Sequence, residues 1–135
     1  LDARHVLQDL AQRTTEQTGV DCTLDCLQQP QVADSITASH LYRIVQEAVS
    51  NALRHGRPQH IWLTLRDTSD GLYVSVRDVG SGVAEPARNG PVVGIPTMRY
   101  RAGMVGGDLQ ISAAAGGGTL VTCTLPRKII DGKNG

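Results

Sequence analysis

Glu47, Asn51 and His55 recur every four residues along a stretch with strong helical periodicity. Because a helix turns once every 3.6 residues, these side chains form one stripe beside the apolar face. A carboxylate and a carboxamide on adjacent turns offer oxygen atoms, and Mg²⁺ takes oxygen ligands while keeping waters and binding substrate phosphates. The stripe is therefore a candidate magnesium site. Taken alone, it fits a solvated helix face better.

A second candidate is the segment Asp78-Val79-Gly80-Ser81-Gly82, which directly follows an alternating strand pattern. A carboxylate at the end of a strand can point into a crevice, and two glycines let the backbone approach a ligand closely or take a positive φ. The segment predicts a ligand-binding turn. The alternative is an ordinary acidic turn with glycines, which is common.

Two further glycine-containing stretches could contact a ligand. Residues 90–95 lead into a helical pattern that carries Arg99 and Arg101. A loop followed by a helix N-terminus can hold phosphate through backbone N–H groups and the helix dipole, although an ordinary surface loop fits as well. Gly118-Thr119 opens the last strand, where the threonine hydroxyl either bonds a ligand or simply packs.

Helical and strand patterns surround these residues and must position them. Apolar spacing predicts helices over residues 3–18, 39–55 and 95–105, and alternation predicts strands over 20–26, 61–66, 72–77, 109–113 and 119–125. Residues 28–35 and 79–94 are predicted as loops. Helices over an antiparallel-rich sheet make an α+β sandwich.

Length and charge limit the function classes. A chain of 135 residues favours one domain, which we expect to span residues 1–127, with a flexible tail at 128–135. Thirteen basic and thirteen acidic residues give a formal net charge of zero. This balance argues against a nucleic-acid-binding module, which usually carries a basic excess.

The three cysteines give no disulfide framework, because their number is odd. Cys22 and Cys26 lie four residues apart and Cys123 is distant, so buried reduced thiols are favoured over a zinc site. Reduced thiols fit a cytoplasmic location, and no apolar run reaches the length of a membrane span. The first residues begin within a helical pattern, so we expect the chain to be part of a longer protein.

Taken together, these features resemble the GHKL ATPase superfamily. Residues 41–55 (LYRIVQEAVSNALRH) resemble its N box, in the form found in sensor histidine kinases of the nitrate-sensor and lipid-thermosensor group. Residues 78–82 resemble the G1 box, residues 93–101 that group's G2 region, and residues 117–119 its GGT strand start. The resemblance covers about residues 3–126. It implies the Bergerat fold, a two-layer α/β sandwich with about three helices on a mixed, mostly antiparallel sheet, and it implies ATP and Mg²⁺ as cofactors.

The resemblance also implies a role for the matching polar residues. Asn51 would coordinate the Mg²⁺ that bridges the ATP phosphates. Glu47 would be the catalytic residue, which polarises or deprotonates the nucleophile or positions water near the metal. Asp78 would accept the adenine amine, with Thr119 assisting through water. Phosphoryl transfer needs mainly positioning and charge neutralisation, which is consistent with these roles.

Other matching residues would bind the nucleotide around this centre. Residues 83–94 would form a short ATP lid. The remaining cofactor-binding residues are two near the phosphates, two that let the adenine pocket close and one in the G2 region: Arg54, His55, Gly80, Gly82 and Gly94.

Three positions depart from the family pattern. Thr97 stands where the last glycine of the G2 pattern is usual, Val92 replaces an earlier glycine, and Tyr100 replaces a glutamate. A β-branched residue at a glycine position can change the lid backbone or weaken phosphate contacts. We expect ATP binding to survive these changes, whereas turnover stays open.

None of the four histidines (His5, His40, His55, His60) has the acidic context of the family's phospho-accepting histidine. The resemblance therefore implies the catalytic part of a two-component kinase. It would transfer phosphate to a histidine on a dimerisation domain adjoining the 1–18 helix, and a response regulator would then receive that phosphate. We expect the isolated domain to be monomeric. The alternatives are a non-catalytic ATP-binding module, a serine kinase of the anti-sigma-factor type and an α+β domain without nucleotide.

Overall fold

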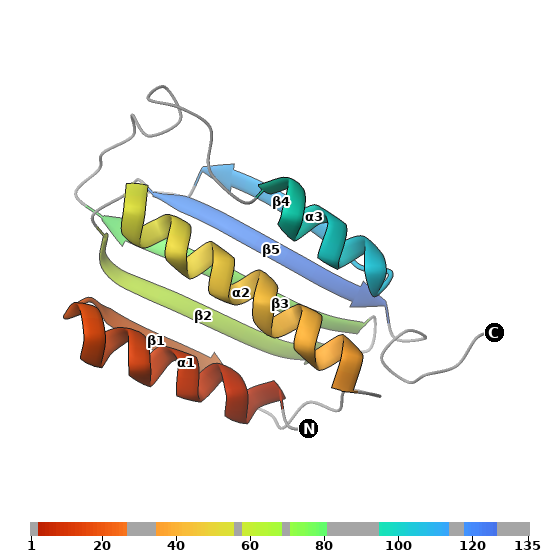
Figure 1. Ribbon diagram of the computed structural model, residues 1–135, viewed down its shortest axis with the longest axis horizontal. Coiled ribbons are helices and arrows are strands. Elements are labelled where there is room, and N and C mark those ends of the chain that lie inside the picture. Colours follow the sequence, from red (N-terminus) through yellow and green to blue (C-terminus); the bar gives the residue numbers. More distant parts are fainter. Residues whose placement is uncertain are drawn as a thin grey trace.

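Three helices lie on one face of a five-stranded sheet in the computed structural model, which describes residues 3–26, 35–55, 58–68, 71–80, 95–113 and 118–126 (Figure 1). The helices are α1 (Ala3–Thr18), α2 (Ser35–His55) and α3 (Ile95–Met104). The strands are β1 (Asp21–Cys26), β2 (Pro58–Thr68), β3 (Gly71–Gly80), β4 (Asp108–Ala113) and β5 (Thr119–Pro126). The predicted two-layer α+β sandwich is confirmed.

The sheet is mixed, as the resemblance implied. Its strand order is β1-β2-β3-β5-β4, in which β1 and β2 run parallel and the three other pairs run antiparallel. Parallel neighbours need a long crossover connection, and α2 lies in the segment between β1 and β2. This connection places α2 across the sheet, where it can contribute a whole face to the core.

The helix and strand bounds differ from the predicted ones mainly at polar ends. Helix α1 has the predicted bounds, whereas α2 begins at Ser35, one turn before the predicted start at Ser39. That added turn buries Thr37 and Ala38 but exposes its one large apolar side chain, Ile36 (67%), so it does not continue the apolar pattern. Strands β2 and β3 also extend beyond their alternating cores, because their polar ends pair with each other. The predicted tail at 128–135 and residues 28–34 of the predicted loop 28–35 lie outside the described residues, whereas Ser35 belongs to α2.

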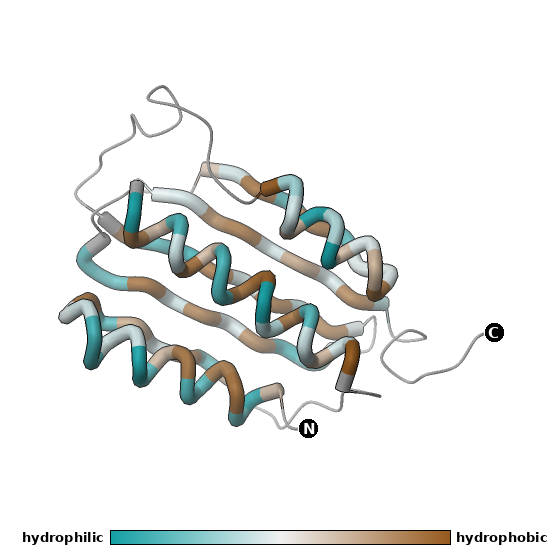
Figure 2. The backbone as a smooth tube through the Cα atoms, viewed as in Figure 1, coloured by the Kyte–Doolittle hydropathy of each residue, from teal (hydrophilic) through white to brown (hydrophobic). Residues whose placement is uncertain are grey.

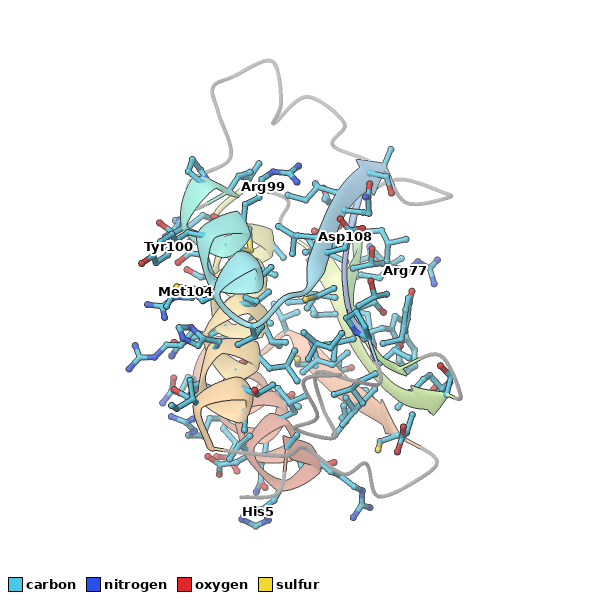
Figure 3. All side chains as sticks on the ribbon, turned by 90° about the vertical axis from the view of Figure 1, so that its right-hand side faces the viewer. His5, Arg77, Arg99, Tyr100, Met104 and Asp108 are labelled. Atoms are coloured by element: carbon cyan, nitrogen blue, oxygen red, sulfur yellow. The ribbon has the colours of Figure 1, made fainter. Side chains whose placement is uncertain are left out.

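The core lies between the helices and the sheet. Apolar residues alternate with polar ones along the strands and recur along α2, as the hydropathy colouring shows (Figure 2), and the buried ones form one core cluster. Seen edge-on, these side chains fill the space between the two layers (Figure 3). Each fully buried leucine or isoleucine contributes roughly 1.5–3 kcal/mol relative to an exposed one. The largest fully buried members from α2, β2 and β3 are Leu41, Ile44, Ile61, Leu63, Leu65 and Leu72.

Candidate functional site

The C-terminal half of α2 carries a polar cluster beside the core. Asn51 is only 7% exposed, although it was predicted on a polar stripe. Residues three and four positions apart share a helix face, so Glu47, Asn51 and Arg54 are neighbours. Nη2 of Arg54 donates a hydrogen bond to Oδ1 of Asn51 at 2.6 Å and to Oε2 of Glu47 at 3.3 Å. A single guanidinium nitrogen thus joins the two residues predicted to act at the metal.

The amide nitrogen of Asn51 has a different environment. Nδ2 is buried and has no hydrogen-bond partner within the described part of the chain. A buried donor without a partner usually costs about 1–3 kcal/mol, so such a group calls for an explanation. The orientation of this carboxamide is therefore set by its oxygen, which faces Arg54.

Asp78 lies near the end of β3, within the strand and not directly after it. It continues the inward-facing series Leu72, Val74 and Val76, and it is 6% exposed. Pairing between β3 and β5 ends at Arg77 and Leu120, whereas β3 continues to pair with β2. The sequence signal for this site was an acidic residue at the end of an alternating strand pattern.

The Asp78 carboxylate is held by the first residue of β5. The main-chain N–H of Thr119 donates to Oδ1 of Asp78 at 2.7 Å. Burial raises the pKa of Asp78 above its ordinary value, and the Thr119 hydrogen bond opposes that rise by favouring the charged form. The structure thus assigns a contact to the Thr119 amide, whereas the sequence analysis considered the hydroxyl.

Gly118 allows this close approach, whereas sequence reasoning had noted it only as the residue that precedes Thr119 at the start of the strand and as part of the GGT motif. Its φ is +92°, in the region that favours glycine. A Cβ atom at this position would collide with the main-chain oxygen and Oδ1 of Asp78. The glycine before Thr119 is therefore needed both for its backbone conformation and for space.

The two polar groups lie at the same end of the molecule. Figure 1 shows the last turns of α2, the end of β3 and the start of β5 together at that end. Of the other predicted residues, Gly80 is the last residue of β3 and His55 the last of α2, and the His55 side chain is not described. Gly82, Gly94 and the predicted lid at 83–94 lie outside the described residues.

Helix α3 carries two of the three positions that depart from the family pattern. Thr97 lies in its first turn, where the backbone is helical and a β-branched residue fits, and Tyr100 is 67% exposed on the side away from the sheet (Figure 3). Met98 is buried, and Nη1 of Arg99 donates to the main-chain oxygen of Leu109 at 3.0 Å. These contacts fix α3 against the core and β4. Val92, the third departure, lies outside the described residues.

The donor chemistry of the α2 cluster fits Mg²⁺. The described residues contain no cluster of three or more His, Cys, Asp or Glu side chains that could hold a metal. Mg²⁺ in phosphate-binding sites usually takes only one or two protein oxygens and completes its shell with water and phosphate. Asn51 and Glu47 offer such oxygens, and both already contact a cationic group, Arg54.

Within the described ranges, no helix combines the length and apolar composition that crossing a membrane requires.

Known proteins share this fold and these sequence features. Residues 36–129 match the family model described as histidine kinase-, DNA gyrase B-, and HSP90-like ATPase. The nitrate/nitrite sensor protein NarQ of Escherichia coli K12 is 35% identical over 122 residues, which are 90% of this chain and 22% of that protein. NarX of the same organism is 32% identical over 126 residues, 93% of this chain and 21% of that protein. The chain thus spans about a fifth of the length of these relatives.

A solved structure extends the likeness to the fold. The ATP-binding domain of PrrB from Mycobacterium tuberculosis superposes with a TM-score of 0.76 at 22% identity, over 94% of this chain and 95% of that one. The five-stranded sheet and three helices thus have the same fold as that domain. The chain belongs to the histidine kinase-, DNA gyrase B- and HSP90-like ATPase family, as an ATP-binding catalytic domain of the sensor histidine kinase type.

Proposed function

We propose that this domain binds Mg·ATP with adenine at Asp78 and the phosphates at the α2 cluster. The observation that carries the proposal is the buried Asp78 carboxylate, one oxygen of which is held by the Thr119 amide. Its second oxygen accepts a hydrogen bond from the exocyclic amine of adenine. Guanine presents a carbonyl oxygen at the corresponding position, and two acceptors repel each other. Asp78 therefore selects ATP over GTP.

At the phosphate end, Asn51 and Glu47 have separate roles. Oδ1 of Asn51 would hold the Mg²⁺ ion, which would supply charge neutralisation at the phosphates. The Glu47 side chain is about one-third exposed, so it can reach the attacking nucleophile and orient it or accept its proton. Arg54 contacts the phosphates through its guanidinium group, and His55, at the end of α2, lies beside them.

The glycines complete the nucleotide pocket. Gly80 and Gly82 let the backbone close on the adenine, and Gly94 belongs to the lid formed by residues 83–94. In the full-length protein, the γ-phosphate passes to a histidine of the dimerisation domain and then to a response regulator. We place this domain in the cytoplasm and expect it to be monomeric by itself. These assignments concern the full-length protein, since the curated relatives are several times longer than this chain. Their support is the match to the family.

Calorimetric titration with ATP and GTP in the presence of Mg²⁺ tests the nucleotide site. We expect saturable binding of ATP, much weaker binding of GTP, and loss of ATP binding in Asp78→Asn. The matched control is Asp108→Asn, because Asp108 is an exposed acid on β4. Equal affinity for ATP and GTP, or equal effects of the two substitutions, would contradict the assignment of adenine to Asp78.

Transfer of radiolabelled phosphate to a separately produced dimerisation domain tests the reaction. We expect transfer with the parent domain and loss of transfer, with ATP binding retained, in Glu47→Gln. The control Glu16→Gln changes an exposed glutamate on α1 and should leave transfer intact. ATP binding without any transfer, in the parent and in Thr97→Gly alike, would instead favour a non-catalytic nucleotide-binding module.

A further inference from the structure

The Arg54 side chain contacts both oxygen atoms that the proposed function places at the metal. Its Nη2 is 2.6 Å from Oδ1 of Asn51 and 3.3 Å from Oε2 of Glu47. Mg²⁺ binds oxygen at about 2.1 Å, so an ion on the same Oδ1 would sit within about 5 Å of the guanidinium nitrogen. Two cations at that separation in a partly buried site repel each other. Arg54 and a metal on Asn51 therefore exclude one another in this arrangement.

We propose that Arg54 is a resident cation which occupies the metal ligands of the nucleotide-free domain and leaves them when Mg·nucleotide binds. The inference rests on the proposed function. The phosphates offer Arg54 a new anionic partner at the moment that Asn51 receives the metal. Free Mg²⁺ brings no such partner, so it binds weakly. Binding of the metal and binding of the nucleotide are thereby coupled, since Arg54 leaves the metal ligands only when the phosphates are there to accept it.

The environment of Asn51 supports this role. Asn51 is 7% exposed, so its carboxamide is fixed by the surrounding protein and not by water. Its Nδ2 finds no partner among the described residues, and a flip of the amide would turn a donor toward Arg54. The Oδ1 atom therefore faces the position of the cation whether that cation is Arg54 or a metal. Asn51 is therefore a preorganised metal ligand.

Arg54 is also free to move. Its side chain is 47% exposed, whereas that of Glu47 is 32% exposed, and it projects from the last turn of α2. An ion pair with this exposure contributes little stability, about 0–1 kcal/mol, so it can be exchanged readily. Departure of Arg54 frees Asn51 and Glu47 together. The same movement therefore uncovers both the metal ligand and the catalytic carboxylate.

Binding of Mn²⁺ to the nucleotide-free domain, followed by its electron paramagnetic resonance signal, tests the exclusion directly. We expect Arg54→Gln to bind Mn²⁺ roughly tenfold more tightly than the parent, within the usual range of coupling between sites. Arg54→Lys keeps the charge and should gain much less. Arg13→Gln is the matched control, because it removes an equal charge from an exposed site on α1.

The gain must also depend on Asn51. In the double variant Arg54→Gln with Asn51→Ala, the Mn²⁺ affinity should return to the parent value. An unchanged Mn²⁺ affinity in Arg54→Gln, an equal gain in Arg13→Gln, or a gain that persists without Asn51 would each overturn the inference. Binding of Mg·ATP by the parent is measured in parallel. If ATP binds but the Mn²⁺ affinity is the same in the parent and in Arg54→Gln, only the inference fails. If ATP does not bind, the proposed function itself fails.

Discussion

Replacement of Gly118 by alanine should damage the nucleotide site more than an equivalent change elsewhere. Gly118 has φ +92°, and a Cβ atom there meets the main-chain oxygen and Oδ1 of Asp78. Gly19 has φ +79° with nothing within 4 Å of an added Cβ. The two glycines thus share the unfavourable backbone conformation, and only Gly118 has the additional collision. Gly19→Ala is therefore the matched control.

The expected magnitudes follow from these two terms. The left-handed conformation costs an alanine roughly 1–2 kcal/mol, and this term applies to both variants. At Gly118 the collision also drives β5 away from Asp78 and breaks the Thr119 hydrogen bond, whose acceptor is charged. Such a bond contributes about 1.5–3 kcal/mol. Gly118→Ala should thus lose about 2.5–5 kcal/mol of unfolding free energy, against 1–2 kcal/mol for Gly19→Ala.

Urea unfolding and ATP titration measure the two consequences. Displacement of Asp78 should weaken ATP binding at least about tenfold in Gly118→Ala, whereas Gly19→Ala should bind ATP like the parent. Most domains of this size have 5–15 kcal/mol of stability, so both variants should fold. Equal losses of stability in the two variants, with equal ATP affinity, would refute the reasoning that Gly118 positions Asp78.

Three further substitutions test other parts of the account. Burial raises the pKa of Asp78, so its contribution to the unfolding free energy is complete below about pH 4 and falls as the pH rises through the raised pKa. In urea titrations, the unfolding free energy of Asp78→Asn should therefore rise relative to that of the parent between about pH 4 and pH 7. A fall over this range would contradict the sign of the argument. Met98→Ala should lower the unfolding free energy by about 2–5 kcal/mol in the same assay, because Met98 is 1% exposed. Met104, on the same helix, is 56% exposed, so Met104→Ala should change the unfolding free energy by less than about 0.5 kcal/mol. Equal losses in the two variants would argue against the packing of α3. Gly103→Ala should raise the melting temperature, because Gly103 is helical and an added Cβ atom there meets nothing within 4 Å. A lower melting temperature in this variant would contradict that reasoning.

Much of the fold follows from periodicity alone. The apolar spacing in residues 3–18 predicted α1 with its observed bounds, and the pattern from Leu41 onward placed the inner face of α2. Where the polar ends of β2 and β3 pair with each other, or where the first turn of α2 exposes its one large apolar side chain, Ile36, the sequence lacks a clear apolar signal. These ends are fixed by strand pairing and helix propagation, which a local pattern does not contain.

The site was predicted in part, since its residue types were visible while its contacts were not. Asp78 stood out as a carboxylate at the end of an alternating strand. Its partner Thr119 lies 41 residues away, and the need for Gly118 arises only where two strands meet. The double contact of Arg54 depends on how side chains orient on one helix, which spacing suggests but does not determine. Side-chain contacts, both between distant segments and along one helix, were thus the part that required a structure.

Nuclear magnetic resonance of the ¹⁵N-labelled domain during titration with Mg·ATP tests the central claim most directly. The claim is that Asp78 and Asn51 belong to one nucleotide site. The main-chain amide of Thr119 and the side-chain amide of Asn51 report on its two ends. We predict that both signals shift with the same dissociation constant, and that Mg·GTP at equal concentration leaves the Thr119 signal in place. Unchanged signals at both positions under saturating Mg·ATP would contradict the account.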